Sequence, residues 1–247
     1  STDLLLCLFP FEEDLLRQHN VNSIFIGHPL ADSVDHGIDI LSARNALQLD
    51  AQAKTVITLM PGSRNTEIKR HAGLLFEAAD LISKKYDLVE FVVPVVNYTI
   101  EQELKKLLTD RFQNLNVVIT DNATLALSAC DLVITKSGTS TLEAALHKKP
   151  LIVVYKMSSL SYWFLRIFKI VKTNYISLPN ILLGKEVVPE LIQKEAHPES
   201  IFNASVLYLS SQKVVDELQE QFDGLYLELK RNASMLAANA IIEIIEE

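Results

Sequence analysis

The chain has 247 residues, of which 49% are hydrophobic, and it carries a net charge of −8 with a pI near 5.3. Because neutralising the phosphates of a nucleic acid needs a basic surface, this charge argues against nucleic-acid binding. The sequence has no run of roughly 18 apolar residues, the length a membrane span needs, and its start lacks the pattern of a signal peptide. We therefore expect a cytoplasmic protein, one that can also touch a membrane surface.

Short apolar runs typical of strands alternate with helical patterns along the chain. Strands that are apolar on both faces indicate a parallel sheet covered by helices on both sides. The alternation predicts right-handed βαβ units, hence an α/β fold with a Rossmann-like parallel sheet. After residue 187 the sequence shows only helical patterns. The predicted strands are 4–9, 23–26, 55–60, 89–96, 116–120, 132–135, 151–155 and 175–178.

The pattern breaks at residues 27–35, where glycine, proline and histidine interrupt it. We therefore expect residues 1–30 to be the last strand–helix–strand of a preceding Rossmann-like domain. Residues 31–210 would form the main Rossmann-like domain. Residues 211–247 are predicted to be helices whose apolar stripes pack on another domain or on a second subunit, so a homodimer is one expectation.

Ligands of open α/β sheets bind beyond the carboxyl ends of the strands, and the loop KSGTST at 136–141 lies there. Gly138 allows close backbone approach, and the following helix start offers free N–H groups and partial positive charge. Hydroxyl residues at 139–141 add donors. An alternative stays open, because Ser140 and Glu143 have the spacing of a capping box, which would explain both without a ligand.

A second loop of this kind is PGSRNTE at 61–67. Arg64 opposes the helix dipole at this position, so it is poorly placed for helix stability but well placed to fork onto a phosphate. The alternative is that Arg64 pairs with Glu67 or with another surface acid. Two phosphate-type loops at neighbouring strand ends predict a diphosphate and hence a nucleotide. The patterns GxxxxGK[ST] and GxGxxG are both absent, which argues against ATP hydrolysis and NAD-dependent hydride transfer.

Other segments are less specific. In SLPNILLG at 177–184, Asn180 presents an amide to the same edge, although ordinary turn chemistry explains it nearly as well. The histidines show no metal-ligand spacing and are expected to be structural or solvent-facing, with His28 the strongest candidate for another role. Cys7 and Cys130 are expected to be buried thiols.

The segment 161–172 holds the single tryptophan. It fits an interfacial helix beside anionic lipid, an acyl-chain groove, or a core helix with a basic edge.

Together these residues resemble the lipid-A-disaccharide synthase family. The resemblance covers nearly the whole chain in the family's order, up to about residue 210. It is carried by FPFE (9–12), IGHPLAD (26–32), LMPGSRNTEI (59–68), VVPVVN (92–97), SGTSTLEAAL (137–146), VVYKM (153–157) and KTNYISLPNILLGKEVVPELIQKE (172–195).

This resemblance implies a GT-B glycosyltransferase, an inverting UDP-dependent enzyme that works at the cytoplasmic face of the inner membrane. It would join UDP-2,3-diacylglucosamine to 2,3-diacylglucosamine 1-phosphate, giving lipid A disaccharide 1-phosphate and UDP. The chain would be the carboxyl, donor-binding half of the enzyme. The general base would come from the amino-terminal half, which lies outside this sequence. No cofactor and no divalent metal are expected.

The resemblance also implies roles for individual residues. Gly138 and Thr139 would hold the UDP diphosphate, and Glu143 would accept hydrogen bonds from the ribose hydroxyls. Arg64 would bind phosphate and stabilise the charge that develops on the leaving UDP. The remaining expected contacts are Gly62 and Ser63 with the phosphate, backbone near Tyr155 and Met157 with the uracil edge, and Asn180 with donor sugar or phosphate.

Two other functions stay open at this point. Another GT-B enzyme, such as a UDP-sugar 2-epimerase or a different UDP-glycosyltransferase, would share these loops. A non-catalytic UDP-binding module would share them too.

Overall fold

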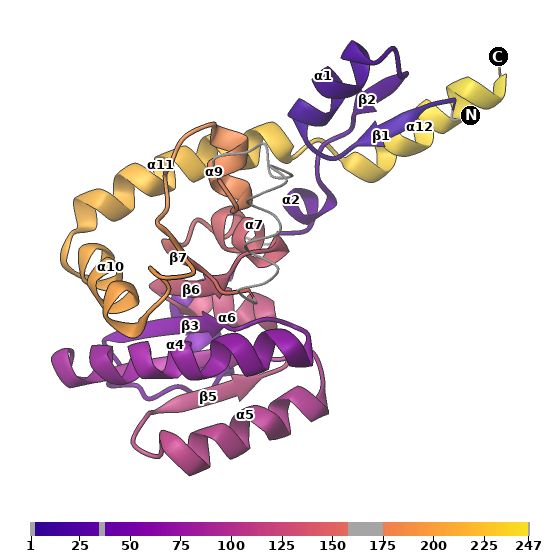
Figure 1. Cartoon of the computed structure of the whole chain (residues 1–247). Helices are drawn as coiled ribbons and strands as arrows, with labels where there is room; N and C mark the ends of the chain where they lie inside the picture. The colour runs from indigo at the N-terminus through magenta and orange to yellow at the C-terminus, as the bar shows by residue number, and fades with distance from the viewer. Residues whose placement is uncertain (1–2, 35–37, 158–174, 247) are drawn as a thin grey trace.

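The computed structural model describes residues 3–34, 38–157 and 175–246 (Figure 1). The segment 161–172 lies outside these ranges. Within them, six strands form one parallel sheet in the order β5-β4-β3-β6-β7-β8. The chain thus moves outward from β3 to one edge, returns to the centre at β6 and moves to the other edge, which confirms the predicted Rossmann-like fold. The strands are β3 Thr55–Met60, β4 Val89–Pro94, β5 Val117–Thr120, β6 Leu132–Lys136, β7 Leu151–Tyr155 and β8 Glu190–Ile192.

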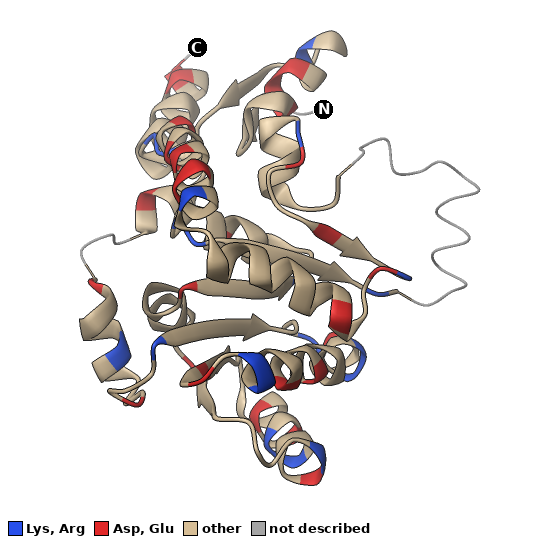
Figure 2. Cartoon of the chain, turned by 90° about the vertical axis from the view of Figure 1, so that its left-hand side faces the viewer, with Lys and Arg blue, Asp and Glu red and all other residues tan. Residues whose placement is uncertain are grey.

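Helices cover both faces of this sheet. On one face α4 packs between α5 and α10, and on the other α6 packs against α3, while α7 contacts α9 and α11. The four inner strands are almost fully buried, because their valine, isoleucine and leucine side chains meet helices above and below. Figure 2 accordingly shows charged residues mainly on helices and loops. The helices are α3 Ile40–Ala46, α4 Asn65–Lys85, α5 Tyr98–Arg111, α6 Ala123–Ala129, α7 Thr139–Leu146, α9 Leu178–Leu183, α10 Pro198–Ser210 and α11 Gln212–Leu229.

The last strand of the sheet differs from the sequence prediction. The predicted strand at 175–178 is wrong, since α9 begins at Leu178 with Pro179 in its first turn, where proline favours a helix start. The prediction of helices alone after residue 187 is also wrong, because β8 pairs in parallel with β7. Its Glu190 carboxylate accepts the N–H groups of Ile176 and Ser177 at 2.8 and 2.9 Å. The 176–177 segment is therefore tied to the sheet edge by a side chain rather than by strand pairing.

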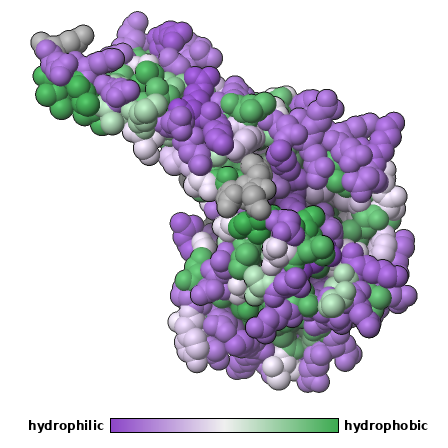
Figure 3. Space-filling model, turned by 180° about the vertical axis from the view of Figure 1, so that it is seen from behind, coloured by the Kyte–Doolittle hydropathy of each residue, from purple (hydrophilic) through white to green (hydrophobic). Residues whose placement is uncertain are grey.

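Residues at the two ends of the described chain form a separate arm (Figure 1). Strands β1 (Leu5–Cys7) and β2 (Ser23–Phe25) pair in parallel around α1 (Pro10–Gln18), as the predicted strand–helix–strand requires. Helix α12 (Ala233–Glu246) runs beside them. Figure 3 shows apolar patches on this arm. The large apolar residues of α12 that are exposed are Met235, Ile241, Ile242 and Ile245.

The apolar stripe of α11, in contrast, is already covered. Its Leu218, Phe222, Leu225 and Leu229 are buried within this chain, where α11 packs on α7, α9 and α10. The predicted docking of the late helices on another domain or subunit therefore concerns α12 and not α11. No helix in the described ranges has the length and apolarity needed to cross a membrane.

The two connections between arm and main sheet are bonded to each other. The His28 N–H donates to the Leu229 carbonyl at 2.9 Å, and the Asp32 carboxylate accepts the N–H groups of Asn232 and Ala233 at 2.9 and 2.6 Å. Asp32 thus caps α12 from α2 (Pro29–Ser33), two hundred residues earlier. His28, the histidine singled out in the sequence, is the N-cap of α2, and its Nδ1 accepts the Leu30 N–H at 3.1 Å, which is a structural role.

Gly27 is required where these connections meet. Its φ is +84°, and a Cβ there would lie 2.6 Å from the Leu229 carbonyl oxygen. We expect Gly27→Ala to lower the free energy of unfolding by about 2–4 kcal/mol, from the left-handed backbone and the overpacking together. Gly184→Ala is the matched control, since Gly184 has φ +65° and nothing within 4 Å. Urea unfolding of both variants measures the difference, and equal losses would contradict the close-contact explanation.

Candidate functional site

A cavity of about 460 Å³ lies beyond the carboxyl ends of β3, β4 and β6. This is where the direction of the strand order reverses, the position at which α/β sheets of this type bind ligands. Four predicted residues line it together, namely Gly62, Ser63, Thr139 and Glu143. The remaining lining residues are Met60, Pro94, Val95, Val96, Asp121, Ala123, Lys136 and Ser140.

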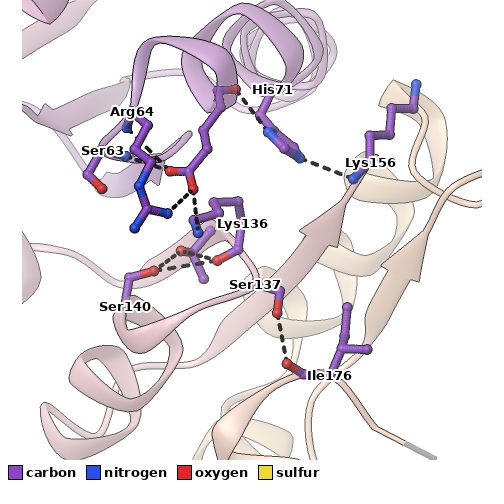
Figure 4. Close-up of polar contacts among 10 residues, drawn as sticks. Ser63, Arg64, His71, Lys136, Ser137, Ser140, Lys156 and Ile176 are labelled. Carbon is purple, nitrogen blue, oxygen red and sulfur yellow. Dashed lines mark hydrogen bonds and ion pairs between the residues drawn. The ribbon is translucent and has the colours of Figure 1, made fainter. Parts of the chain in front are cut away.

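An ion pair that the sequence analysis did not assign connects the two predicted loops. The Lys136 Nζ lies 3.1 Å from the Glu67 Oε1, and each side chain is only 17% exposed. Lys136 ends β6 and Glu67 lies in the first turn of α4, so the pair joins the turn after β3 to the turn after β6 (Figure 4). Because Lys136 and Glu67 are 69 residues apart, the sequence gives no local signal for their pairing.

Four donors from the described residues converge on the Glu67 carboxylate. Oε2 accepts the backbone N–H groups of Ser63 at 2.9 Å and of Arg64 at 3.4 Å. Oε1 accepts from the Arg64 guanidinium at 3.2 Å and from Lys136 at 3.1 Å. Burial by itself would raise the pKa of Glu67, but the Ser63 N–H and the Lys136 ammonium outweigh it and hold the pKa below its ordinary value.

Two glycines leave room for this ion pair. Gly62 has φ +131°, and a Cβ there would lie 2.6 Å from the Glu67 carboxylate. Gly138 has φ +155°, and a Cβ there would lie 2.9 Å from the Lys136 Nζ. The glycine of each loop thus accommodates one partner of the pair.

The capping-box alternative for the 136–146 loop is wrong. Helix α7 begins at Thr139 with Gly138 as its N-cap, so Ser140 is inside the helix and cannot form the box with Glu143. The Ser140 hydroxyl lies 2.8 Å from that of Thr135, and the Thr141 hydroxyl donates to the Gly138 carbonyl at 2.7 Å. These two hydroxyls therefore hold the loop in place, while Thr139 is exposed at the cavity.

Glu143 lines the cavity from α7 and is partly buried. Burial raises the pKa of its carboxyl above the ordinary value. A carboxylate in this position can accept hydrogen bonds from a ligand's hydroxyl groups.

Arg64 is exposed, and its guanidinium pairs with Glu67, which is the alternative that the sequence analysis left open. With a side chain 78% exposed, Arg64 does not line the cavity, but it shares a carboxylate with Lys136, which does. Arg64 and Gly138 thus lie at the same end of the sheet, as the phosphate-site prediction requires.

Tyr155 and Met157, in contrast, are absent from the cavity wall. The Met157 N–H donates to the Gln193 side chain at 3.2 Å, and the Lys156 N–H donates to His71 Nε2 at 3.1 Å. Burial lowers the pKa of His71, and because Nε2 is the acceptor, Nδ1 donates to the Glu67 carbonyl at 2.9 Å. His71 therefore bridges α4 and the end of β7, which is a structural role (Figure 4).

Asn180 is also outside the cavity, and the structure corrects its expected role. It is fully buried, and its amide donates to the Val188 carbonyl and to the Glu190 carboxylate, both at 2.9 Å. Its oxygen accepts the N–H groups of Val187 and Val188 at 2.8 and 3.0 Å. Since these bonds satisfy the amide, Asn180 organises the turn before β8 and offers nothing to a ligand in this structure.

Solved structures with similar folds include a UDP-GlcNAc 2-epimerase and a wall teichoic acid polymerase. UDP-GlcNAc 2-epimerase from Neisseria meningitidis, solved with UDP-GlcNAc, matches with a TM-score of 0.62 at 13% identity, over 98% of this chain and 62% of that one. The wall teichoic acid polymerase TagF matches with a TM-score of 0.55 at 20% identity, over 99% and 57%. At these identities the likeness concerns the fold, and it supports a GT-B-type arrangement.

Sequence relatives are closer. The family model described as lipid-A-disaccharide synthetase matches residues 1–245. Lipid-A-disaccharide synthases from Hahella chejuensis and Azotobacter vinelandii are 37% and 39% identical over 248 residues, each covering 100% of this chain. The chain spans 62% and 64% of the lengths of these two relatives. The chain therefore belongs to the lipid-A-disaccharide synthase family.

Proposed function

We propose that this chain is the UDP-donor-binding part of a glycosyltransferase that makes lipid A disaccharide 1-phosphate. The donor would be UDP-2,3-diacylglucosamine and the acceptor 2,3-diacylglucosamine 1-phosphate. Family membership supports this reaction, and the relatives carry the name of the enzyme. The observation on which the site assignment rests is the cavity between the starts of α4 and α7, where Ser63, Lys136 and Thr139 come together.

The chemistry of that cavity fits a diphosphate. Two helix N-termini supply N–H donors and partial positive charge, and Lys136 supplies a full charge. Glu143 lies on the same wall and would accept from the ribose hydroxyls. When the glycosidic bond to UDP breaks, negative charge develops on the diphosphate. Lys136, Arg64 and the helix starts would stabilise that charge in a preorganised site without a metal.

Further parts of this proposal concern the rest of the enzyme. Residues 1–30 would be the end of an amino-terminal domain, and α12 would pack on that domain, which would supply the general base and most of the acyl-binding surface. The exposed apolar residues of the arm fit such a covered surface. The protein would act at the cytoplasmic face of the inner membrane as a peripheral enzyme, and a homodimer remains part of the proposal.

Of the alternatives, a UDP-sugar 2-epimerase has support from fold likeness only, at 13% identity in the Neisseria structure. The sequence relatives favour the synthase. If the general base lies in another part of the protein, this chain alone would bind UDP without catalysing the reaction.

The first prediction is metal-independent UDP binding. We expect calorimetry to detect one UDP site on the 247-residue chain, with the same dissociation constant in EDTA and in Mg²⁺, because cations and helix N-termini of the protein face the diphosphate. A fluorescence competition assay provides an independent measurement. No binding, or binding in Mg²⁺ alone, would overturn the site assignment.

A second prediction concerns Arg64. Arg64→Ala should weaken UDP binding by about 1.5–3 kcal/mol, the scale for losing a hydrogen bond to a charged group. Arg111→Ala is the control, since Arg111 is also exposed and paired with a glutamate, Glu77, at 2.8 Å. Equal UDP affinities of wild type and Arg64→Ala would show that Arg64 serves the protein and not the ligand.

A third prediction follows from the raised pKa of Glu143. A carboxyl whose pKa is higher in the folded protein favours folding when protonated, so its contribution to stability is lost as pH rises from about 4.3, the ordinary value, through the folded pKa. Glu143→Gln cannot ionise. We therefore expect this variant to be more stable than wild type at pH 7, with the difference vanishing near pH 4, and to bind UDP more weakly. Thermal unfolding at both pH values checks this, and a less stable variant at pH 7 would contradict it.

A further inference from the structure

The Glu67 carboxylate occupies the kind of environment that a phosphate group would occupy. Two of its donors are backbone N–H groups at the start of a helix, those of Ser63 and Arg64. The other two are the cations of Arg64 and Lys136. Helix-start N–H groups together with lysine and arginine are the usual ligands of phosphate in proteins. The protein thus has an anion of its own at this point.

This arrangement also affects the cavity. Ser63 and Lys136 both line it, and both are bonded to Glu67. The lysine that faces the cavity is therefore already neutralised by an internal partner, and neither side chain of the pair is more than 17% exposed. An incoming diphosphate would meet a carboxylate beside the cations that it needs.

We propose that Glu67 is a resident counter-ion that competes with the diphosphate for Lys136 and Arg64. Without ligand it holds the two cations together and keeps the turns after β3 and β6 in place. When the diphosphate binds, the cations change partner, and the two anions then lie close to each other. The repulsion between them weakens the hold on UDP, so Glu67 sets a moderate affinity that allows the product to leave. This inference rests on the proposed UDP site and deepens it.

The direct test is Glu67→Gln. The glutamine oxygen can still accept the N–H groups that begin α4, whereas the neutral amide no longer holds Lys136 as an ion pair. We expect the variant to bind UDP roughly tenfold more tightly, which corresponds to about 1.4 kcal/mol. Its dissociation rate, measured by stopped-flow competition, should fall by a similar factor. Unchanged or weaker UDP binding would overturn the proposal and leave Glu67 as a helix cap.

Ligand controls separate a charge effect from a general change in shape. Inorganic pyrophosphate should gain affinity as UDP does, because it presents the same anion. Uridine lacks the diphosphate and should bind wild type and variant alike. If the affinity for uridine rises as much as the affinity for UDP, Glu67 does not compete with the diphosphate.

Glu77→Gln provides the matched protein control. Glu77 lies in the same helix and also forms an ion pair, with Arg111 at 2.8 Å. Ten residues of helix place it about 15 Å further along the axis, beyond the screening length at physiological salt. The charge change is identical, so UDP affinity should stay at the wild-type value. If Glu77→Gln also binds UDP tenfold more tightly, the effect comes from the net charge of the protein and not from competition at the site.

A double-mutant cycle with Lys136→Met tests the mechanism itself. Lys136→Met should weaken UDP binding, and adding Glu67→Gln to it should restore less than the tenfold gain, since one of the contested cations is gone. Full additivity of the two effects on UDP affinity would contradict competition through Lys136.

If Glu67→Gln does not fold, Glu67→Asp replaces it, because the shorter side chain draws the carboxylate back from Lys136 and should give a smaller gain in UDP affinity. Absence of UDP binding in wild type would instead refute the proposed function, so the two failures are distinguishable.

Discussion

The ion pair between Lys136 and Glu67 is the interaction on which the site depends. It joins the ends of two neighbouring strands, β3 and β6, at the point where the strand order reverses. Removing one partner would leave the other charge poorly solvated, since both side chains are mostly buried. Residues 62 and 138 are glycines with positive φ values of +131° and +155°, which other residues rarely adopt, and the ion pair lies directly beside them. The electrostatic contact therefore lies against both glycine turns and the start of α4, and it holds the cationic group beside the cavity.

The sheet makes this contact possible. Parallel strands buried on both faces place the helix starts at one edge, and the reversal between β3 and β6 separates the helices that follow them to opposite faces. The cavity lies between those two helix starts. Because the backbone there is held by hydroxyl groups at 140 and 141 and by the Glu67 carboxylate, the donors are in position before a ligand arrives. Such preorganisation is what a site without a metal needs to stabilise a diphosphate.

Much of the fold could be predicted from the sequence, because runs such as TVITLM and LIVVY are long, β-branched and bounded by turn residues. Strand β8 could not, since it has three residues and contains a glutamate that serves as a hydrogen-bond acceptor for another segment. The two phosphate-type loops, at 61–67 and 136–141, could be predicted because each has a glycine just after an apolar strand and before a helix. Lys136 and Glu67 were missed because their partnership spans 69 residues and carries no local pattern. Asn180 was predicted to face a ligand because a turn sequence does not reveal the four hydrogen bonds that its amide makes within the protein.

A crystal structure of the chain with UDP tests the central claim most directly. The account predicts the diphosphate between the starts of α4 and α7, with the Lys136 ammonium on a phosphate oxygen and the ribose beside Glu143. It also predicts that the distance between Lys136 Nζ and Glu67 Oε1 becomes longer than the 3.1 Å of the present structure. A diphosphate bound elsewhere, or bound here with the Lys136–Glu67 pair intact, would contradict the account.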